Sequence, residues 1–460
     1  MHSTTDRQNG KQQAPRRQTR GGLSRRSFLR QSVAVGALPA FMPGLSRANS
    51  PNARLQHASI GVGGMGSSDL NSILNGGTTD IVAICDVDAD SLAKAAEKLP
   101  GARKYRDWRE LLEKEAEKID SVNVSTPDHM HAPIAMTAIR LGKHVYCQKP
   151  LTHTVHEARQ LALAARKAGV VTQMGIQIHA DISYRMAVRI IQDGAIGKVK
   201  EWHSWQGAAS SATGGRPAGD DPVPAALDWD KWIGVAPMRP YKKDIYHPFL
   251  WRGWQDFGSG MMGDFACHIL DPVFTALELR HCLSVRTEAP DVNKETFPAW
   301  QVAHFKFPGT KYTDSQTIEG TWYNGSKGPS RELVPMPAEY QLPGAGSIIV
   351  GEEGVMVLPH WAGPQLYPLE KFKGYERPQV KSLDHYQQWV DACLGKGKAE
   401  ANFDYAGPLT ETAQLGNVGI HFAGQTLEWD WRNLKITNVA EADKYLHKTY
   451  RKGWAVEDLT

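Results

Sequence analysis

The pattern of apolar and polar positions divides the chain into two parts. Between residues 55 and 175, short apolar runs typical of strands alternate with stretches of helical pattern. The predicted strands are 55–60, 80–86, 121–125, 144–147 and 170–175, and the predicted helices are 67–74, 91–99, 107–119, 133–140 and 155–168. This alternation predicts an α/β fold with a doubly wound parallel sheet, whose ligands bind beyond the carboxyl ends of the strands.

Local signals mark the ends of three of these helices. Asp107 is suited to cap the start of its helix, Pro133 is tolerated in a first helical turn, and Gly169 is suited to end a helix. These residues support the boundaries that the apolar pattern predicts.

The second part of the chain has a different pattern. We expect an amphipathic helix at 182–193, which Gly194 stops, and strands at 198–206, 301–307, 347–350 and 354–357. This predicts an α+β domain with a largely antiparallel or mixed sheet. The loop at 210–224, rich in Gly, Pro and Asp, is read equally well as a lid, an interaction arm or a surface insertion. The predicted division is 1–48 as a signal segment, 49–175 as a nucleotide-binding domain and 176–460 as a substrate-binding and oligomerisation domain.

The first 48 residues have the pattern of a twin-arginine export signal. Arg25 and Arg26 precede an apolar run at 32–42 that is too short to span a bilayer, and Ala48 ends a small-x-small cleavage site. We therefore expect a periplasmic or otherwise exported protein that uses the twin-arginine machinery and begins near Asn49. The alternative is a disordered basic tail.

Removing this segment reverses the charge of the chain. It holds nine Lys or Arg and one acid, so the formal net charge of +4 becomes about −4 for the remainder. Such a chain has no general attraction for nucleic acid, and no later basic helix suggests a membrane anchor. Five widely spaced cysteines without a C-x-x-C pair predict neither a disulfide framework nor a zinc site. His129-x-His131 is poor evidence for a metal, so none is expected.

A glycine pattern predicts a dinucleotide site rather than an ordinary structural turn. Gly61, Gly63 and Gly66 form G-x-G-x-x-G between a predicted strand and a predicted helix, with Asp86 twenty residues beyond the last glycine. The glycines allow a tight turn and close approach of a pyrophosphate to the helix N-terminus, and the acid suits a ribose 2′-hydroxyl. No arginine adjoins Asp86 to receive a 2′-phosphate, which favours NAD over NADP.

Two further stretches carry groups suited to alcohol oxidation. Lys149 follows a predicted strand, where its ammonium could orient a hydroxyl and favour a developing alkoxide; a solvent-facing lysine is the ordinary alternative. Asp264 and His268 are four residues apart, so on a helix the carboxylate can hold the imidazole that accepts the hydroxyl proton. Taken alone, such a pair is more often a surface or core contact.

Together these motifs resemble the Gfo/Idh/MocA oxidoreductase family over nearly all of the chain after residue 48. The glycine pattern, Thr126-Pro127 with His131, Lys149-Pro150, Gly194-x-Ile196-Gly197 and Asp264-x-x-x-His268 occur in the order and spacing of that family. The resemblance implies that Lys149 polarises a sugar or polyol hydroxyl, that His268 is the general acid/base and that Asp264 is its partner. It also implies a large open sheet that packs in homo-oligomers.

One departure concerns the residue before the motif lysine. The family carries Glu there, where a carboxylate would pair with or tune the lysine, and this chain has Gln148. The departure bears on the charge of Lys149 and on the pH optimum rather than on the fold.

The candidate site residues fall into two groups. Those expected at the cofactor are Gly61, Gly63, Gly64, Met65, Gly66, Asp86, Ser125, Thr126, Pro127, His129, His131, Gln148, Lys149 and Gln177. Those expected at the substrate are His179, Tyr246, Trp251, Arg252, Trp254, Asp264 and His268, since Arg and His can bind hydroxyls or a carboxylate and indoles can stack on sugars.

The function that these residues predict is an exported, NAD-dependent oxidation of a sugar or polyol hydroxyl by hydride transfer. Because a periplasm has no free NAD pool, two alternatives remain: a sugar-to-sugar oxidoreductase that retains its cofactor, and an NAD-assisted glycoside hydrolase with a transient keto intermediate. A sugar-binding scaffold with a degenerate site is a third possibility, which the retention of Lys149, Asp264 and His268 argues against.

Overall fold

The computed structural model describes residues 54–459 of the chain. The predicted twin-arginine segment and its cleavage site lie outside the described residues. No described helix is long and apolar enough to cross a bilayer, and residues 54–459 hold no cluster of three or more His, Cys, Asp or Glu arranged for a metal.

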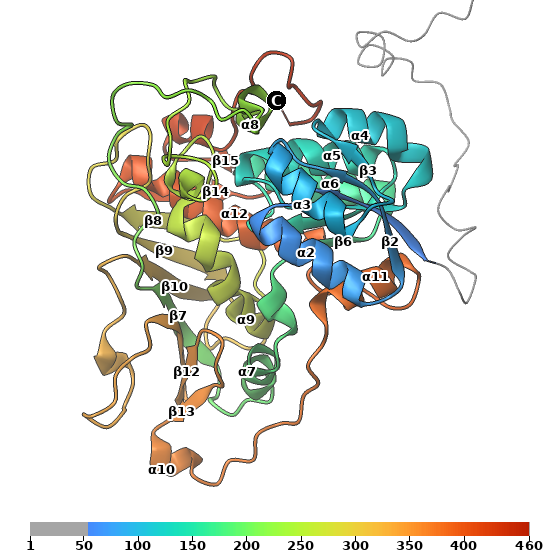
Figure 1. The fold of residues 1–460 in the computed structure, drawn as a ribbon. Coiled ribbons are helices and arrows are strands. Elements are labelled where there is room, and N and C mark those ends of the chain that lie inside the picture. Colours follow the sequence, from blue (N-terminus) through green and yellow to red (C-terminus); the bar gives the residue numbers. More distant parts are fainter. Residues whose placement is uncertain (1–53, 460) are drawn as a thin grey trace, which may run out of the picture. The chain divides into compact units, whose positions relative to one another are not determined.

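The first sheet has six parallel strands in the order β3-β2-β1-β4-β5-β6 (Figure 1). Because the order reverses between β1 and β4, the sheet is doubly wound, as the alternating pattern predicted. The strands are β1 (Leu55–Ile60), β2 (Thr79–Cys85), β3 (Arg103–Tyr105), β4 (Ser121–Val124), β5 (His144–Gln148) and β6 (Thr172–Gly175). The helices are α2 (Gly64–Asn75), α3 (Ala89–Lys98), α4 (Trp108–Glu115), α5 (His131–Arg140) and α6 (Val155–Ala168).

The end signals act as local physical chemistry requires. The Asp107 side chain accepts a hydrogen bond from the backbone N–H of Arg109 at the start of α4. Gly169 ends α6 in the left-handed region, with φ of 67°. These contacts involve neighbours in sequence, which is why the boundaries could be predicted.

The second sheet is mixed and has nine strands in the order β13-β12-β11-β7-β10-β9-β8-β14-β15. Only β7 and β10 pair in parallel; the other described pairs of this sheet are antiparallel. The strands are β7 (Val199–Gln206), β8 (Ser284–Glu288), β9 (Gln301–Pro308), β10 (Thr317–Asn324), β11 (Ala345–Gly351), β12 (Val355–Pro359), β13 (Gln365–Tyr367), β14 (Thr426–Asp430) and β15 (Lys435–Ile436). The predicted mixed sheet is confirmed, but β8, β10 and β13 to β15 were not predicted.

Helices α9 (Cys267–Leu277) and α12 (Phe403–Gly419) pack on this sheet, and α7 (Ile182–Gln192) packs on α9 (Figure 1). Trp202, Phe305 and Phe307 project from the strands into that core and meet Phe274 of α9. The remaining helices of this part are α8 (Trp229–Ile233), α10 (Leu369–Phe372) and α11 (His385–Cys393). Helices α7 and α9, the second of which carries His268, thus contribute to the same apolar core.

The end of the chain returns to the first sheet. Helix α11 packs on α2, where Trp389 joins the apolar cluster that holds Leu70 and Ile73, and α12 packs on α6. These two helices therefore pack on helices of the first sheet, although they lie beyond the division predicted at residue 175. Apolar contacts distant in sequence attach residues 385–419 to both sheets.

A long segment between β7 and α9 also reaches back to the first sheet. The backbone N–H of Ala89 donates to the carbonyl of Ala226 at 2.9 Å, and the N–H of Asp228 donates to that of Val87 at 3.0 Å. The predicted loop at 210–224 has no helix or strand. The segment therefore lies beside the carboxyl end of β2.

Candidate functional site

The glycine pattern forms the turn that the sequence predicted. Gly61 has φ of +83°, and a Cβ on it would lie 2.4 Å from the carbonyl oxygen of Ser125. A Cβ on Gly66 would lie 2.1 Å from the carbonyl oxygen of Gly61. Only glycine fits at these positions, and the turn presents the N-terminus of α2, where a pyrophosphate can bind.

Asp86 lies at the end of β2 and is tied to this turn. Its carboxylate accepts hydrogen bonds from the N–H of Val62 at 2.9 Å, of Gly63 at 3.2 Å and of Asp88 at 2.9 Å. Arg106, a cation beside this strand end, donates to the carbonyls of Val87 and Ala226 at 2.5 and 2.6 Å. The residues present thus fit NAD: Asp86 would hold the adenosine ribose, while one nitrogen of the Arg106 guanidinium is bound to backbone carbonyls.

Ser125 and Gln148 lie at the carboxyl ends of β4 and β5, on the opposite side of the strand-order reversal from Asp86. Both side chains donate to the carboxylate of Asp69 on α2, Ser125 at 2.6 Å and Gln148 to both oxygens at 2.9 Å. Tyr386 of α11 donates to it at 2.7 Å, and Gln177 donates to Tyr386 at 2.9 Å. Gln148, which departs from the family pattern, therefore donates to a buried acid, Asp69, that the sequence interpretation missed.

Lys149 is paired with Asp264. Its ammonium donates to the Oδ1 atom of Asp264 at 2.5 Å and to the backbone carbonyl of the same residue at 2.8 Å, and the Nε atom of Arg252 lies 3.6 Å from that Oδ1. The three side chains are 16%, 21% and 23% exposed, so each retains an edge open to a ligand. Burial alone would raise the pKa of Asp264, but the charges of Lys149 and Arg252 outweigh it and hold that pKa below its ordinary value.

Asp264 accepts hydrogen bonds from Lys149, and the described residues show none between Asp264 and His268. The charge of Asp264 still acts to raise the pKa of His268, as the predicted pairing requires. Residues Met262–Ala266 form a π-helical turn before α9. The Nδ1 atom of His268 is buried and has no hydrogen-bond partner in the described structure. Asp264 thus orients the lysine rather than the imidazole.

His268 is held neutral. Burial lowers its pKa well below the ordinary value, and the charge of Lys149 adds to that effect. A neutral imidazole beside a fixed ammonium can accept a proton while the ammonium stabilises a developing alkoxide.

Asp128 is a further acid at this site that the sequence interpretation missed. Its side chain is buried, Ser259 hydrogen-bonds it, and Lys149 and Arg252 are close enough to favour its charged form. Burial, together with the charge of Asp264, nevertheless raises the pKa of Asp128 to about 7. The only sequence signal was its place between Pro127 and His129, where a strand end meets the site.

The raised pKa of Asp128 predicts a stability that falls with pH. The folded protein holds this proton to about pH 7, whereas an unfolded chain releases it near pH 4, so raising the pH between these values costs the wild-type protein stability. The Asp128→Asn variant should escape this loss, and its stability relative to wild type should improve by up to about 4 kcal/mol across that range. Denaturant unfolding at several pH values measures the difference; a constant difference would contradict the assignment.

The two histidines predicted at the cofactor are buried instead. His129 contacts the carbonyl oxygens of Trp232 and Phe257, and His131 lies 2.8 Å from the carbonyl oxygens of both Thr126 and Pro150. Burial lowers their pKa values to about 3 and about 4. The prediction of cofactor contact is corrected: these rings support the ends of the strands, because backbone carbonyls there need partners.

The predicted aromatic wall is likewise largely internal. Tyr246, Trp251 and Trp254 are 0%, 7% and 3% exposed and belong to an apolar cluster with Trp229 and Phe257. Stacking on a substrate is therefore corrected to packing for these three residues.

Arg252 is the member of this stretch that meets the site. Its guanidinium lies 4.3 Å from the ring centroid of Trp251 and 4.4 Å from that of Phe249, and its Nε atom lies 3.6 Å from Asp264. It remains a candidate substrate residue.

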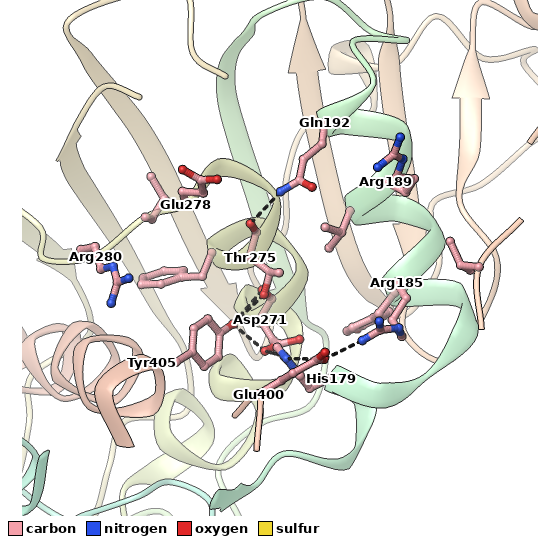
Figure 2. Close-up of a pocket in the computed structure, with 15 residues that line it drawn as sticks. His179, Arg185, Arg189, Gln192, Asp271, Thr275, Glu278, Arg280, Glu400 and Tyr405 are labelled. Carbon is pink, nitrogen blue, oxygen red and sulfur yellow. Dashed lines mark hydrogen bonds and ion pairs between the residues drawn. The ribbon is translucent and has the colours of Figure 1, made fainter. Parts of the chain in front are cut away.

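His179 lies in a cavity of about 580 Å³ between α7, α9 and the start of α12 (Figure 2). Its Nδ1 atom is 2.8 Å from Asp271, to which Tyr405 also donates at 2.6 Å. Burial alone would lower the pKa of His179, but Asp271 outweighs it and raises that pKa above the ordinary value. Asp271, one turn beyond His268 on α9, was not predicted.

Contacts connect this cavity with His268. The ring of His360 lies 5.9 Å from that of His268 and is hydrogen-bonded through Nδ1 to Tyr184 at 2.9 Å. Tyr184 lines the cavity together with His179. His360 and Tyr184 thus form a chain of contacts between His268 and the lining of this cavity.

Comparisons with known proteins identify the family of this chain. Residues 55–176 match the Gfo/Idh/MocA description "Oxidoreductase family, NAD-binding Rossmann fold", and residues 199–321 match "Oxidoreductase family, C-terminal alpha/beta domain". Together the two matches cover more than half of the chain. The chain belongs to the Gfo/Idh/MocA oxidoreductase family.

Members of the Gfo/Idh/MocA family with curated names are similar over part of the chain. Levoglucosan dehydrogenase from Pseudarthrobacter phenanthrenivorans is 26% identical over 41% of this chain and 40% of its own length. Inositol 2-dehydrogenase from Klebsiella pneumoniae is 35% identical over 30% of this chain and 41% of its own length. The chain thus spans about two-fifths of the length of these relatives.

Among solved structures, the WlbA dehydrogenase from Bordetella pertussis, in complex with NADH and UDP-GlcNAcA, has a TM-score of 0.57 at 16% identity. The match covers 82% of this chain and 99% of that one, and it supports the fold.

Proposed function

We propose that this Gfo/Idh/MocA member oxidises a hydroxyl group of a sugar or polyol with NAD. The observation that carries the proposal is the convergence of Lys149, Asp264 and neutral His268 next to the carboxyl ends of β4 and β5, beside an intact dinucleotide turn. The names of the relatives, which include dehydrogenases of levoglucosan and inositol, support a carbohydrate substrate.

The roles of the residues follow from their charges. The nicotinamide, when bound, supplies the acceptor for the hydride that leaves the carbinol carbon. His268 accepts the hydroxyl proton, the ammonium of Lys149 stabilises the oxygen as negative charge develops on it, and Asp264 holds that ammonium in place. Arg252 binds a neighbouring polar group of the substrate.

The test adds sugars, polyols and aryl glycosides singly to the protein with NAD, while the absorbance of reduced nicotinamide and the products are followed. A lasting rise with one alcohol, together with oxidised product, is the expected result. A rise that a second carbonyl compound reverses would support sugar-to-sugar exchange with retained cofactor. Glycoside cleavage without a lasting rise would contradict net oxidation and favour NAD-assisted hydrolysis.

We also propose export through the twin-arginine pathway and assembly into a homo-oligomer. The first rests on Arg25, Arg26 and the apolar run that follows them, and the second on the family resemblance. We expect to recover from the periplasmic fraction a chain that lacks the first 48 residues. Light scattering should give a mass that is a multiple of the mass of one chain. Retention of an intact chain in the cytoplasm would contradict export.

A further inference from the structure

Asp69 is a fully buried carboxyl group on α2 that the proposed reaction does not use. Its three hydrogen-bond partners, Ser125, Gln148 and Tyr386, come from the end of β4, the end of β5 and α11. No lysine or arginine among residues 54–459 lies within ion-pair distance of it. Any charge on Asp69 is therefore not neutralised by a protein cation.

The contacts of Ser125 indicate that its hydroxyl donates to Asp69. The ring of His57 contacts the Oδ1 atom of Asn123 at 2.9 Å, and the amide of Asn123 donates to the hydroxyl of Ser125 at 2.8 Å. The hydroxyl hydrogen of Ser125 is thus left to donate to Asp69.

The same holds on the other two sides. Gln177 donates to the hydroxyl of Tyr386, whose own hydrogen therefore points to Asp69. The Oε1 atom of Gln148 accepts from the N–H of Lys149 at 3.3 Å, which turns its amide nitrogen toward both carboxylate oxygens. Asp69 thus receives donors from three sides, an arrangement that stabilises its ionised form.

Burial acts in the opposite direction. It raises the pKa of Asp69, while the three hydrogen bonds lower it. The three donors therefore oppose the effect of burial and stabilise the carboxylate.

The position of Asp69 relates it to one half of the cofactor. Asp86 at the end of β2 marks the adenosine side of the crevice, so a bound nicotinamide would lie on the other side of the strand-order reversal, beyond β4 and β5. Ser125 follows β4 and Gln148 ends β5, and both side chains donate hydrogen bonds to Asp69 on α2. An ionised group there acts on the nicotinamide ring through a low-dielectric interior.

We propose that Asp69 makes the site favour the oxidised cofactor, whose nicotinamide ring is a cation, over the reduced cofactor, whose ring is neutral. The inference rests on the proposed NAD site. It assigns Asp69 as a positioning and tuning residue that keeps the resting protein loaded with oxidised cofactor, ready to accept a hydride.

The test compares the dissociation constants of NAD and NADH by calorimetry and nicotinamide fluorescence in wild type and in Asp69→Asn. The wild-type protein should bind NAD at least as tightly as NADH, and the variant should shift the ratio toward NADH by about tenfold, which corresponds to about 30 mV for a two-electron couple. Glu115→Gln, which removes another buried carboxylate of the same domain, should leave the ratio unchanged.

A second variant guards against misfolding, because in the single variant the new amide at position 69 would face three donors. Combining Asp69→Asn with Gln148→Glu moves the carboxylate from position 69 to position 148 and the amide in the opposite direction. This double variant should therefore fold and restore the wild-type ratio. An unchanged ratio in the single variant, a double variant that remains shifted, or a wild-type protein that binds NADH tenfold more tightly than NAD would each overturn the inference. A protein that binds neither form would overturn the proposed function itself.

Discussion

Replacing Lys149 with methionine should lower kcat/KM for the proposed oxidation of a sugar or polyol by about a thousandfold. The ammonium is the positive charge that acts most strongly on His268, and Asp264 holds it through two hydrogen bonds, so its loss leaves the developing alkoxide without its donor. NAD binding should fall by less than tenfold, because the turn at Gly61–Gly66 and Asp86 are untouched.

The measurement is initial-rate kinetics with the substrate found in the absorbance test, beside a separate titration with NAD. Lys200→Met, which removes an exposed lysine from β7, is the matched control and should leave both quantities unchanged. A Lys149→Met variant that keeps a tenth or more of the wild-type kcat/KM would contradict the assigned role.

Replacing Gln148 with glutamate, the residue of the family pattern, should destabilise this protein by about 3 kcal/mol at pH 8. The new carboxylate would face both oxygens of Asp69 where an amide now donates at 2.9 Å, and an uncompensated buried charge costs energy of this size. The folded pair would retain a proton to a higher pH than the unfolded chain, so the loss should be small near pH 4 and grow as the pH rises.

Thermal unfolding across this pH range tests the prediction. Adding Asp69→Asn to Gln148→Glu should recover most of the lost stability at pH 8, since one carboxylate and one amide again share the hydrogen bonds. A single variant as stable as wild type at pH 8 would show that the two side chains do not meet. The departure from the family pattern is thus explained as a match to Asp69.

Several features of the site could be predicted because they depend on neighbours in sequence. Gly61 and Gly66 are demanded by local backbone geometry, and Lys149 was placed by its position at the end of a strand. The hydrogen bond between Asp264 and His268 that α-helical spacing predicts is not found, since Asp264 lies in a π-helical turn and accepts from Lys149 instead.

Burial accounts for the other differences. His129, His131 and Trp254 have the chemical character of binding residues, but each faces the interior, where backbone carbonyls or aromatic rings surround it. Polarity along a loop does not reveal which side of it other segments will cover.

The sequence by itself determined the doubly wound sheet, the dinucleotide turn and the presence of a lysine, an aspartate and a histidine suited to alcohol oxidation. These follow from periodicity, from the steric needs of glycine and from residue chemistry, all of which act over a few residues. Only the tertiary structure decided that Asp264 pairs with Lys149 and that Tyr386 and Gln148 meet at Asp69, 317 and 79 residues away. The physical reason is that partners of a buried charge are chosen by packing, which brings together segments whose separation in sequence carries no signal of their contact.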